Sequence, residues 1–135
     1  MNSSDVDFQQ EALDPIAFRA TPKTISALVP DNTIGTYLLL DHNTPVYVGR
    51  SDTGLKSRLM QHEHLHGATH VLWSPRSSPL RAYLLEAAWY HRIQELPQES
   101  LNQVHPARPD TESGLVCPFC GYDDEQALRE ILPYA

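Results

Sequence analysis

The sequence has few cysteines, no long apolar run and no excess of basic side chains. Two cysteines among 135 residues cannot form the disulfide framework of a small secreted domain. No stretch approaches the roughly 20 apolar residues that a membrane-spanning helix needs. The first residues are acidic and lack the basic-then-apolar order of a secretory signal. We therefore expect a cytoplasmic protein in a reducing compartment, with no membrane contact.

The scarcity of basic side chains also bears on the partners of the protein. Ten Lys and Arg face 17 Asp and Glu, a net charge of −7, which argues against an ordinary nucleic-acid binder because phosphate binding needs clustered cations. The deficit is uneven. The net charge is −3 over residues 1–34 and −5 over residues 109–135, whereas residues 35–108 hold seven basic and six acidic side chains. This arginine-rich centre is compatible with a nucleic-acid site and equally with an ordinary solvated surface.

Apolar residues make up 41% of the chain, enough for the core of one domain. Thr21-Pro22 is typical of a helix start, and Pro30 ends that short helix. Two β-rich runs, 36–40 and 46–48, flank a turn and predict a hairpin.

The second half of the chain continues with helix and strand patterns. Leu55, Leu59 and Met60 predict the core-facing side of a helix after Gly54, and residues 69–74 predict a third strand. Ser78-Pro79 predicts the start of a helix over about 80–95. A final short helix is expected over 123–132.

These elements predict a small α/β domain. It has a three-stranded sheet with flanking helices, in the order strand, strand, helix, strand, helix. We expect an N-terminal extension with a short helix over 1–33, the domain itself over 34–104, and a C-terminal extension with a CPFCG turn over 105–135.

Several polar residues of this domain are candidates for a functional site. Tyr37 and Tyr47 lie in the paired strands, where tyrosines commonly only pack across the sheet. Arg58 and His62 are four apart on one helix face, a spacing also found on plain exposed faces. Glu86 falls in an otherwise apolar helix, where a buried carboxylate needs a partner such as a cation.

Taken together, these residues resemble a known family. The order Gly35-Thr36-Tyr37, Tyr47-Val48-Gly49-Arg50, then Arg58, His62, Glu86 and Asn102, is similar to the motifs of the GIY-YIG nuclease superfamily. The stretch YVGRSDTGLKSRLMQH over 47–62 carries most of the likeness, which spans about 34–104. Thr36 and Val48 replace the usual isoleucines, and both are β-branched residues suited to a strand.

The resemblance implies a DNA endonuclease that hydrolyses phosphodiester bonds with one divalent cation, Mg²⁺ or Mn²⁺. It implies that Glu86 binds the cation, that Arg58 binds the phosphate, and that Tyr37 takes a proton from the attacking water. A phenol has a pKa of about 10, so this last role needs nearby cationic charge to lower the pKa. Tyr47 and His62 would orient water or relay protons, and Asn102 matches an asparagine that some members carry.

We expect further basic residues to bind the phosphates of the substrate, namely Arg50, Lys56, Arg76 and Arg81. With a central charge near +1, duplex binding should be modest and sensitive to salt. The protein is then expected to recognise a structured or damaged DNA, or to rely on a protein partner. The sequence leaves its oligomeric state open.

The two cysteines stand in Cys117-Pro118-Phe119-Cys120-Gly121, which is similar to one knuckle of a zinc ribbon. A structural zinc site needs four ligands. His105 is a candidate for a third, and the sequence indicates no fourth. A site completed by histidines, a site shared between two chains, and free thiols all remain open.

Two functions of different class follow. The leading one is the metal-dependent endonuclease. The alternative is a catalytically weak module of the same fold that binds nucleic acid or a protein through its CPFCG tail. The tyrosine, arginine and glutamate set favours the enzyme, whereas the acidic balance favours the alternative.

Overall fold

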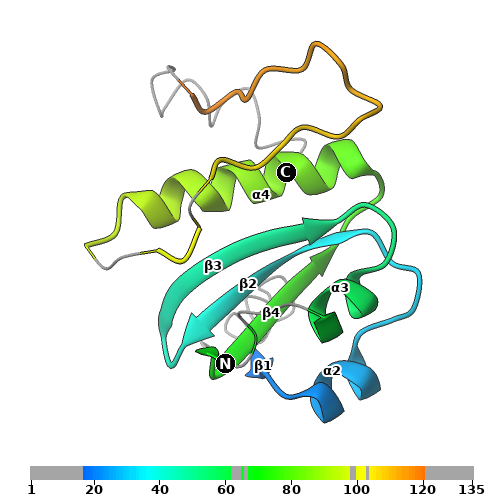
Figure 1. Cartoon of the computed structure of the whole chain (residues 1–135), viewed down its shortest axis with the longest axis vertical. Coiled ribbons are helices and arrows are strands. Elements are labelled where there is room, and N and C mark those ends of the chain that lie inside the picture. The colour runs from blue at the N-terminus through cyan, green and yellow to red at the C-terminus, as the bar shows by residue number, and fades with distance from the viewer. Residues whose placement is uncertain (1–16, 62–64, 66, 98–99, 103, 121–135) are drawn as a thin grey trace, which may run out of the picture.

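The computed structural model of the chain describes residues 17–61, 65, 67–97, 100–102 and 104–120. They form one four-stranded antiparallel sheet and three helices (Figure 1). The elements in chain order are β1 (Phe18–Arg19), α2 (Pro22–Leu28), β2 (Gly35–Asp41), β3 (Thr44–Ser51), α3 (Leu55–Gln61), β4 (His70–Pro75) and α4 (Pro79–Gln94). Among these helices, none has the length and apolar character needed to cross a membrane.

The predicted α/β class is confirmed, but the predicted number of strands is wrong. The sheet runs β1-β4-β2-β3, so β1 adds a fourth strand beside β4. This strand has only two residues, too few for an alternating pattern to be read from the sequence. The Phe18 ring stacks on Trp73 with the ring centroids 5.2 Å apart, and this contact supports the short strand.

The predicted hairpin is present as β2 and β3, and both strands are longer than their apolar runs. Gly35 pairs with Ser51 at one end and Asp41 with Thr44 at the other. The turn between them places His42 at a φ of 57°, in the left-handed region. Pairing therefore extends into polar and glycine residues that the alternation of apolar side chains does not mark.

Helices α2 and α3 cover one face of the sheet and enclose the main core (Figure 1). Its buried side chains are Ile25, Val29, Tyr37, Leu39, Leu55, Leu59, Leu65 and Val71. Met60 is 43% exposed, so its predicted place in the core is wrong. Leu55 and Leu59 are four apart and share a helix face, whereas Met60 is turned about 100° from Leu59.

Helix α4 covers the other face and starts as predicted, with the Ser78 hydroxyl accepting a hydrogen bond from the backbone N–H of Arg81. On the sheet side, the Thr36 hydroxyl donates to the Ala82 carbonyl over 2.7 Å in a buried bond. Residues 104–120, here called the C-terminal strap, run along the outer side of α4 and are drawn in yellow to orange in Figure 1. A small cluster joins them to α4 through Tyr83, Leu84, Ala87 and Cys117, with Leu80, Leu115 and Phe119 packed against it.

The outer edge of β3 is covered by residues 101 and 102. The Leu101 N–H donates to the Val46 carbonyl over 2.7 Å. Asn102 pairs with Val48 through both ends of its amide, accepting from the Val48 N–H (2.8 Å) and donating to the Val48 carbonyl (2.9 Å). These bonds satisfy part of a strand edge that would otherwise be open to other strands.

Candidate functional site

Three of the predicted site residues meet on the α3 side of the hairpin. The Tyr37 and Tyr47 rings lie 6.3 Å apart between centroids, and the Arg58 guanidinium interacts electrostatically with both phenols. Tyr37 stands opposite Gly49 in the sheet. A Cβ at position 49 would lie 2.5 Å from the Tyr37 hydroxyl oxygen, so only glycine leaves room for this phenol.

Burial determines the protonation of Tyr37. The side chain is fully buried, and this burial raises its pKa above the ordinary value of 10.0. The nearby Arg58 guanidinium lowers the pKa, but by less than burial raises it. Tyr37 is therefore a neutral phenol at neutral pH. The positive charge of Arg58 does not lower the Tyr37 pKa enough for this residue to act as a general base.

Glu86 lies on the sheet side of α4, where Arg50 of β3 meets it. The Arg50 Nη1 and Glu86 Oε1 atoms are 2.6 Å apart, and the two side chains are 12% and 10% exposed. Arg50 Nε also pairs with Asp52 Oδ1 at 2.8 Å, and its guanidinium lies 5.3 Å from the Tyr83 ring centroid. One buried guanidinium thus bridges two carboxylates.

The pKa of Glu86 is raised, with burial as the main cause. Arg50 opposes this through its hydrogen bond and charge, and the neighbouring Asp52 charge adds to the increase. The carboxylate is therefore held in a balance that extra positive charge would shift toward the ionised form.

The two groups approach from opposite faces of the β2–β3 pair. Thr36 and Arg50, which are paired, point toward α4, whereas Tyr37 and Gly49 belong to the other face. A recess of about 320 Å³ joins the groups, because Arg50 and Arg58 both line it, together with Ser51, Asp52, Thr53, Gly54, Ser57 and Gln61. The Glu86 charge also acts on Arg58 and on Tyr37.

The donors near Glu86 fit a hard divalent cation. Glu86 and Asp52 offer carboxylate oxygens, the ligand type that Mg²⁺ and Mn²⁺ prefer. A cation there would share the Glu86 carboxylate with Arg50. In this structure the Arg50 guanidinium is the positive group that pairs with both carboxylates.

The four basic residues predicted to grip the substrate have different surroundings. Arg50 is buried in the carboxylate pair, and Lys56 pairs with Asp31 at 3.2 Å. Arg76 Nη2 donates to the Ser74 hydroxyl over 3.0 Å. Arg81 is exposed in the first turn of α4. Arg50 is thus placed to organise the site, whereas a direct phosphate contact by it would require breaking the carboxylate pair.

Two further predicted residues stand apart from the Tyr37–Arg58 group. His62 lies outside the described residues. Asn102 uses its amide on the Val48 backbone, so its visible role is to hold the edge of β3 next to Tyr47 and Gly49. We interpret Asn102 as a positioning residue of this strand.

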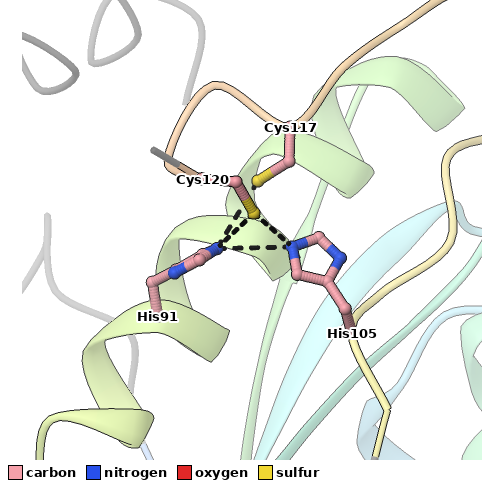
Figure 2. Close-up of side chains that lie close together, drawn as sticks. All are labelled: His91, His105, Cys117 and Cys120. Carbon is pink, nitrogen blue, oxygen red and sulfur yellow. Dashed lines mark hydrogen bonds between the residues drawn. The ribbon is translucent and has the colours of Figure 1, made fainter. Parts of the chain in front are cut away.

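A separate cluster of metal-ligating side chains lies on the outer side of α4. His91, His105, Cys117 and Cys120 point toward one another, and their ligand atoms all lie within 4.8 Å (Figure 2). His91 comes from α4 and the other three from the C-terminal strap. This group could hold a metal ion.

The predicted ligands Cys117, Cys120 and His105 are therefore brought together, and the fourth, His91, was not predicted. Its signal in the sequence is that His91 continues the apolar stripe of Leu84, Ala87 and Ala88 along α4. A polar ring on such a stripe must face a partner, but the pattern does not say which. Four ligands from one chain make a site shared between two chains unnecessary.

Comparisons with protein-family models, with curated proteins and with solved structures give no match to this chain.

Proposed function

We propose that this protein is a divalent-cation-dependent endonuclease that hydrolyses phosphodiester bonds of DNA. The observation that carries the proposal is the recess lined by both Arg50 and Arg58, since Arg50 is paired with Glu86 and Arg58 interacts electrostatically with two tyrosines. The resemblance of the same residues to the GIY-YIG motifs supports it. Asp52 and Arg58 thus line one opening, and Glu86 lies behind it through its pair with Arg50.

Arg58 is the residue that we assign to the scissile phosphate. Arg58 is exposed in α3 and interacts electrostatically with Tyr37 and Tyr47. A guanidinium can bind two phosphate oxygens at once, which a lysine cannot. Arg58 would therefore orient the phosphate and stabilise the charge that develops on it.

Glu86, with Asp52 beside it, is the proposed cation ligand. A bound Mg²⁺ or Mn²⁺ supplies Lewis-acid stabilisation of the phosphate and of the leaving oxygen. Arg50 favours the ionised form of Glu86 by pairing with it, and so opposes the effect of burial on its pKa. Arg50 is thus a positioning residue for the carboxylate.

The roles of the two tyrosines differ in this proposal. Tyr37 is buried and neutral, so its part is to hold Arg58 and to pack against Gly49. Tyr47 also interacts with Arg58, and because it is only half-buried it lies nearer to solvent than Tyr37. Tyr47 is therefore the phenol that we assign to orienting the attacking water.

Two kinds of metal belong to this proposal. The oxygen donors at Glu86 suit a hard cation such as Mg²⁺ or Mn²⁺. The thiols and imidazoles of the second cluster suit a softer ion, and Zn²⁺ is the ion that we assign there.

The decisive experiment compares Glu86→Gln with Glu95→Gln, a matched change at the exposed C-terminal end of α4. Linear, nicked, branched and single-stranded DNA, and RNA, are incubated with Mg²⁺, Mn²⁺ or chelator. We expect metal-dependent cleavage of DNA that Glu86→Gln lowers at least about a hundredfold, as for loss of a group that stabilises the transition state, and Glu95→Gln leaves unchanged. Mn²⁺ binding, followed by electron paramagnetic resonance, should weaken only in Glu86→Gln.

Three results would count against the endonuclease. Full activity in Glu86→Gln would remove the carboxylate from the mechanism. Cleavage of RNA alone would change the substrate class. Binding of nucleic acid or of a protein without any cleavage would favour the catalytically weak module.

A further inference from the structure

The C-terminal strap has little apolar contact to hold it against α4. It contributes Leu115, Cys117 and Phe119 to the small cluster there, whereas Val104 is 78% and Val116 73% exposed. Residues 104–120 also contain no helix or strand. Burial on this scale gives weak stabilisation, so a segment of this length needs another tie.

Four of the six distances between the ligand atoms of the second cluster are close to those of a tetrahedral metal site, and all six are within 4.8 Å. His91 Nε2 lies 3.4 Å from Cys120 Sγ, 3.5 Å from Cys117 Sγ and 3.3 Å from His105 Nε2 (Figure 2). Cys120 Sγ and His105 Nε2 are 3.2 Å apart. Donors about 2.0–2.3 Å from one ion at tetrahedral angles are about 3.3–3.8 Å apart.

The neighbours of these ligands have the arrangement that metal ligands usually need. His105 Nδ1 donates to the Pro106 carbonyl over 2.7 Å, which leaves Nε2 without a proton and facing the cluster. The Tyr83 side chain packs in the same buried cluster as Cys117, and Phe119 packs on His91 with the ring centroids 5.9 Å apart. His105 is thus oriented by a hydrogen bond outside the metal-ligating group, and His91 by ring packing.

We infer that His91, His105, Cys117 and Cys120 bind one Zn²⁺ as a closed structural site that ties the C-terminal strap to the outer side of α4. Two thiolates and two imidazoles are a typical donor set for structural zinc. All four positions are filled by protein, so no position is left for water or substrate. The ion is therefore distinct in place and in task from the cation proposed at Glu86.

The zinc assignment is tested by the metal content of protein purified without a histidine tag. We expect one zinc per chain, and none in His91→Ala or Cys117→Ser. His91→Cys supplies a different zinc ligand at the same place and should keep the ion, and His42→Ala, in the exposed hairpin turn, should also keep it. Co²⁺ in place of zinc should give the visible absorption of a tetrahedral ion and a thiolate charge-transfer band.

The structural task is tested by limited digestion with a glutamate-specific serine protease. Glu112 lies in the C-terminal strap, and the buried Glu86 in α4 serves as the internal control for global unfolding. Chelation should accelerate cleavage at Glu112 far more than at Glu86, and added Zn²⁺ should restore protection. In His91→Cys, protection should follow the retained ion.

Three outcomes would overturn the inference. They are wild-type protein without zinc, equal zinc in His91→Ala, and cleavage at Glu112 that chelation does not change. None of these measurements uses nucleic acid, so their outcome does not depend on whether the protein is an endonuclease. Zinc-loaded protein that cuts no DNA would overturn the proposed function alone, and Glu86→Gln should keep its full zinc content.

Discussion

The two sides of the β-sheet hold their helices by different means. On the α2 and α3 side, eight buried apolar side chains form a continuous core, with Tyr37 and Leu39 of β2 at its centre. On the α4 side, a buried hydroxyl bond from Thr36 and the Arg50–Glu86 pair lie against the sheet. Beyond α4, a small apolar cluster and four metal-ligating side chains lie between the helix and the C-terminal strap.

This difference separates stability from chemistry within one small domain. Apolar burial needs no particular partner, so the α2 and α3 side supplies general stability. Burying a charged or polar group costs free energy unless the group has a specific partner, so such groups are found where a partner is present. The polar side therefore carries both candidate metal sites, and Arg58 with its tyrosines adjoins it through the recess.

The largest expected effect is on the apolar side. Leu39→Ala should lower the free energy of unfolding by about 2–5 kcal/mol, because Leu39 is fully buried and leaves a cavity. Leu115→Ala, in the C-terminal strap, is the matched change on the other side and should cost clearly less because Leu115 is only partly buried. Urea unfolding followed by circular dichroism measures both, and equal losses would contradict the comparison.

The next effect concerns the edge of β3. Asn102→Ala removes two hydrogen bonds to the Val48 backbone and should cost about 1–3 kcal/mol of stability. Asn102→Asp keeps the acceptor but places a carboxylate oxygen against the Val48 carbonyl in place of the donor, so it should cost at least as much as Ala. Cleavage per folded molecule should change little. A loss of activity in fully folded Asn102→Ala would return this residue to the chemistry.

A smaller effect should distinguish the two phenols. Tyr47→Phe should lower DNA cleavage by about tenfold or more, in the range of positioned acid–base groups, and Tyr37→Phe by less. The reason is that Tyr37 is buried and neutral, whereas Tyr47 is nearer to solvent. Steady-state kinetics with Mg²⁺ measures both variants. The reverse order would assign the proton transfer to Tyr37.

The smallest effect is a shift of the acid limb of the pH profile. Burial raises the pKa of Glu86 above its ordinary 4.5, and only the ionised carboxylate binds a cation. Cleavage should therefore fall as the pH drops through this raised pKa, at a higher pH than for an ordinary glutamate. Higher Mg²⁺ should move the limb to lower pH, since a bound cation favours the ionised form. If the acid limb of the pH profile stayed at the same pH when the Mg²⁺ concentration changed, this would contradict the assignment of Glu86 as the cation ligand.

The same pKa has the opposite consequence for stability. Because the folded-state pKa of Glu86 is raised, the folded protein without cation holds this proton more tightly than the unfolded chain. The contribution of Glu86 to stability is thus greatest below the ordinary pKa and is lost as the pH rises through the raised value. Urea unfolding at several pH values, compared with Glu86→Gln, measures it.

Elements with local signals were predictable. The hairpin follows from two β-rich runs around a turn, and α4 from Ser78-Pro79 at its start. Strand β1 was missed because a two-residue strand has no period, and Met60 was misplaced because two adjacent apolar residues cannot both face the core of a short helix. The domain limits, the endonuclease and the roles of the site residues stay predictions.

The sequence by itself determined the α/β class, the hairpin with its two tyrosines, and three of the four side chains in the second cluster. Only the tertiary structure decided that Arg50 forms an ion pair with Glu86 and that burial outweighs Arg58 in setting the Tyr37 pKa. It also decided that His91 completes the group of metal-ligating side chains. The physical reason is range. Periodicity and capping act over a few residues, whereas ion pairing, burial and metal ligation depend on distances between segments that the chain brings together only on folding.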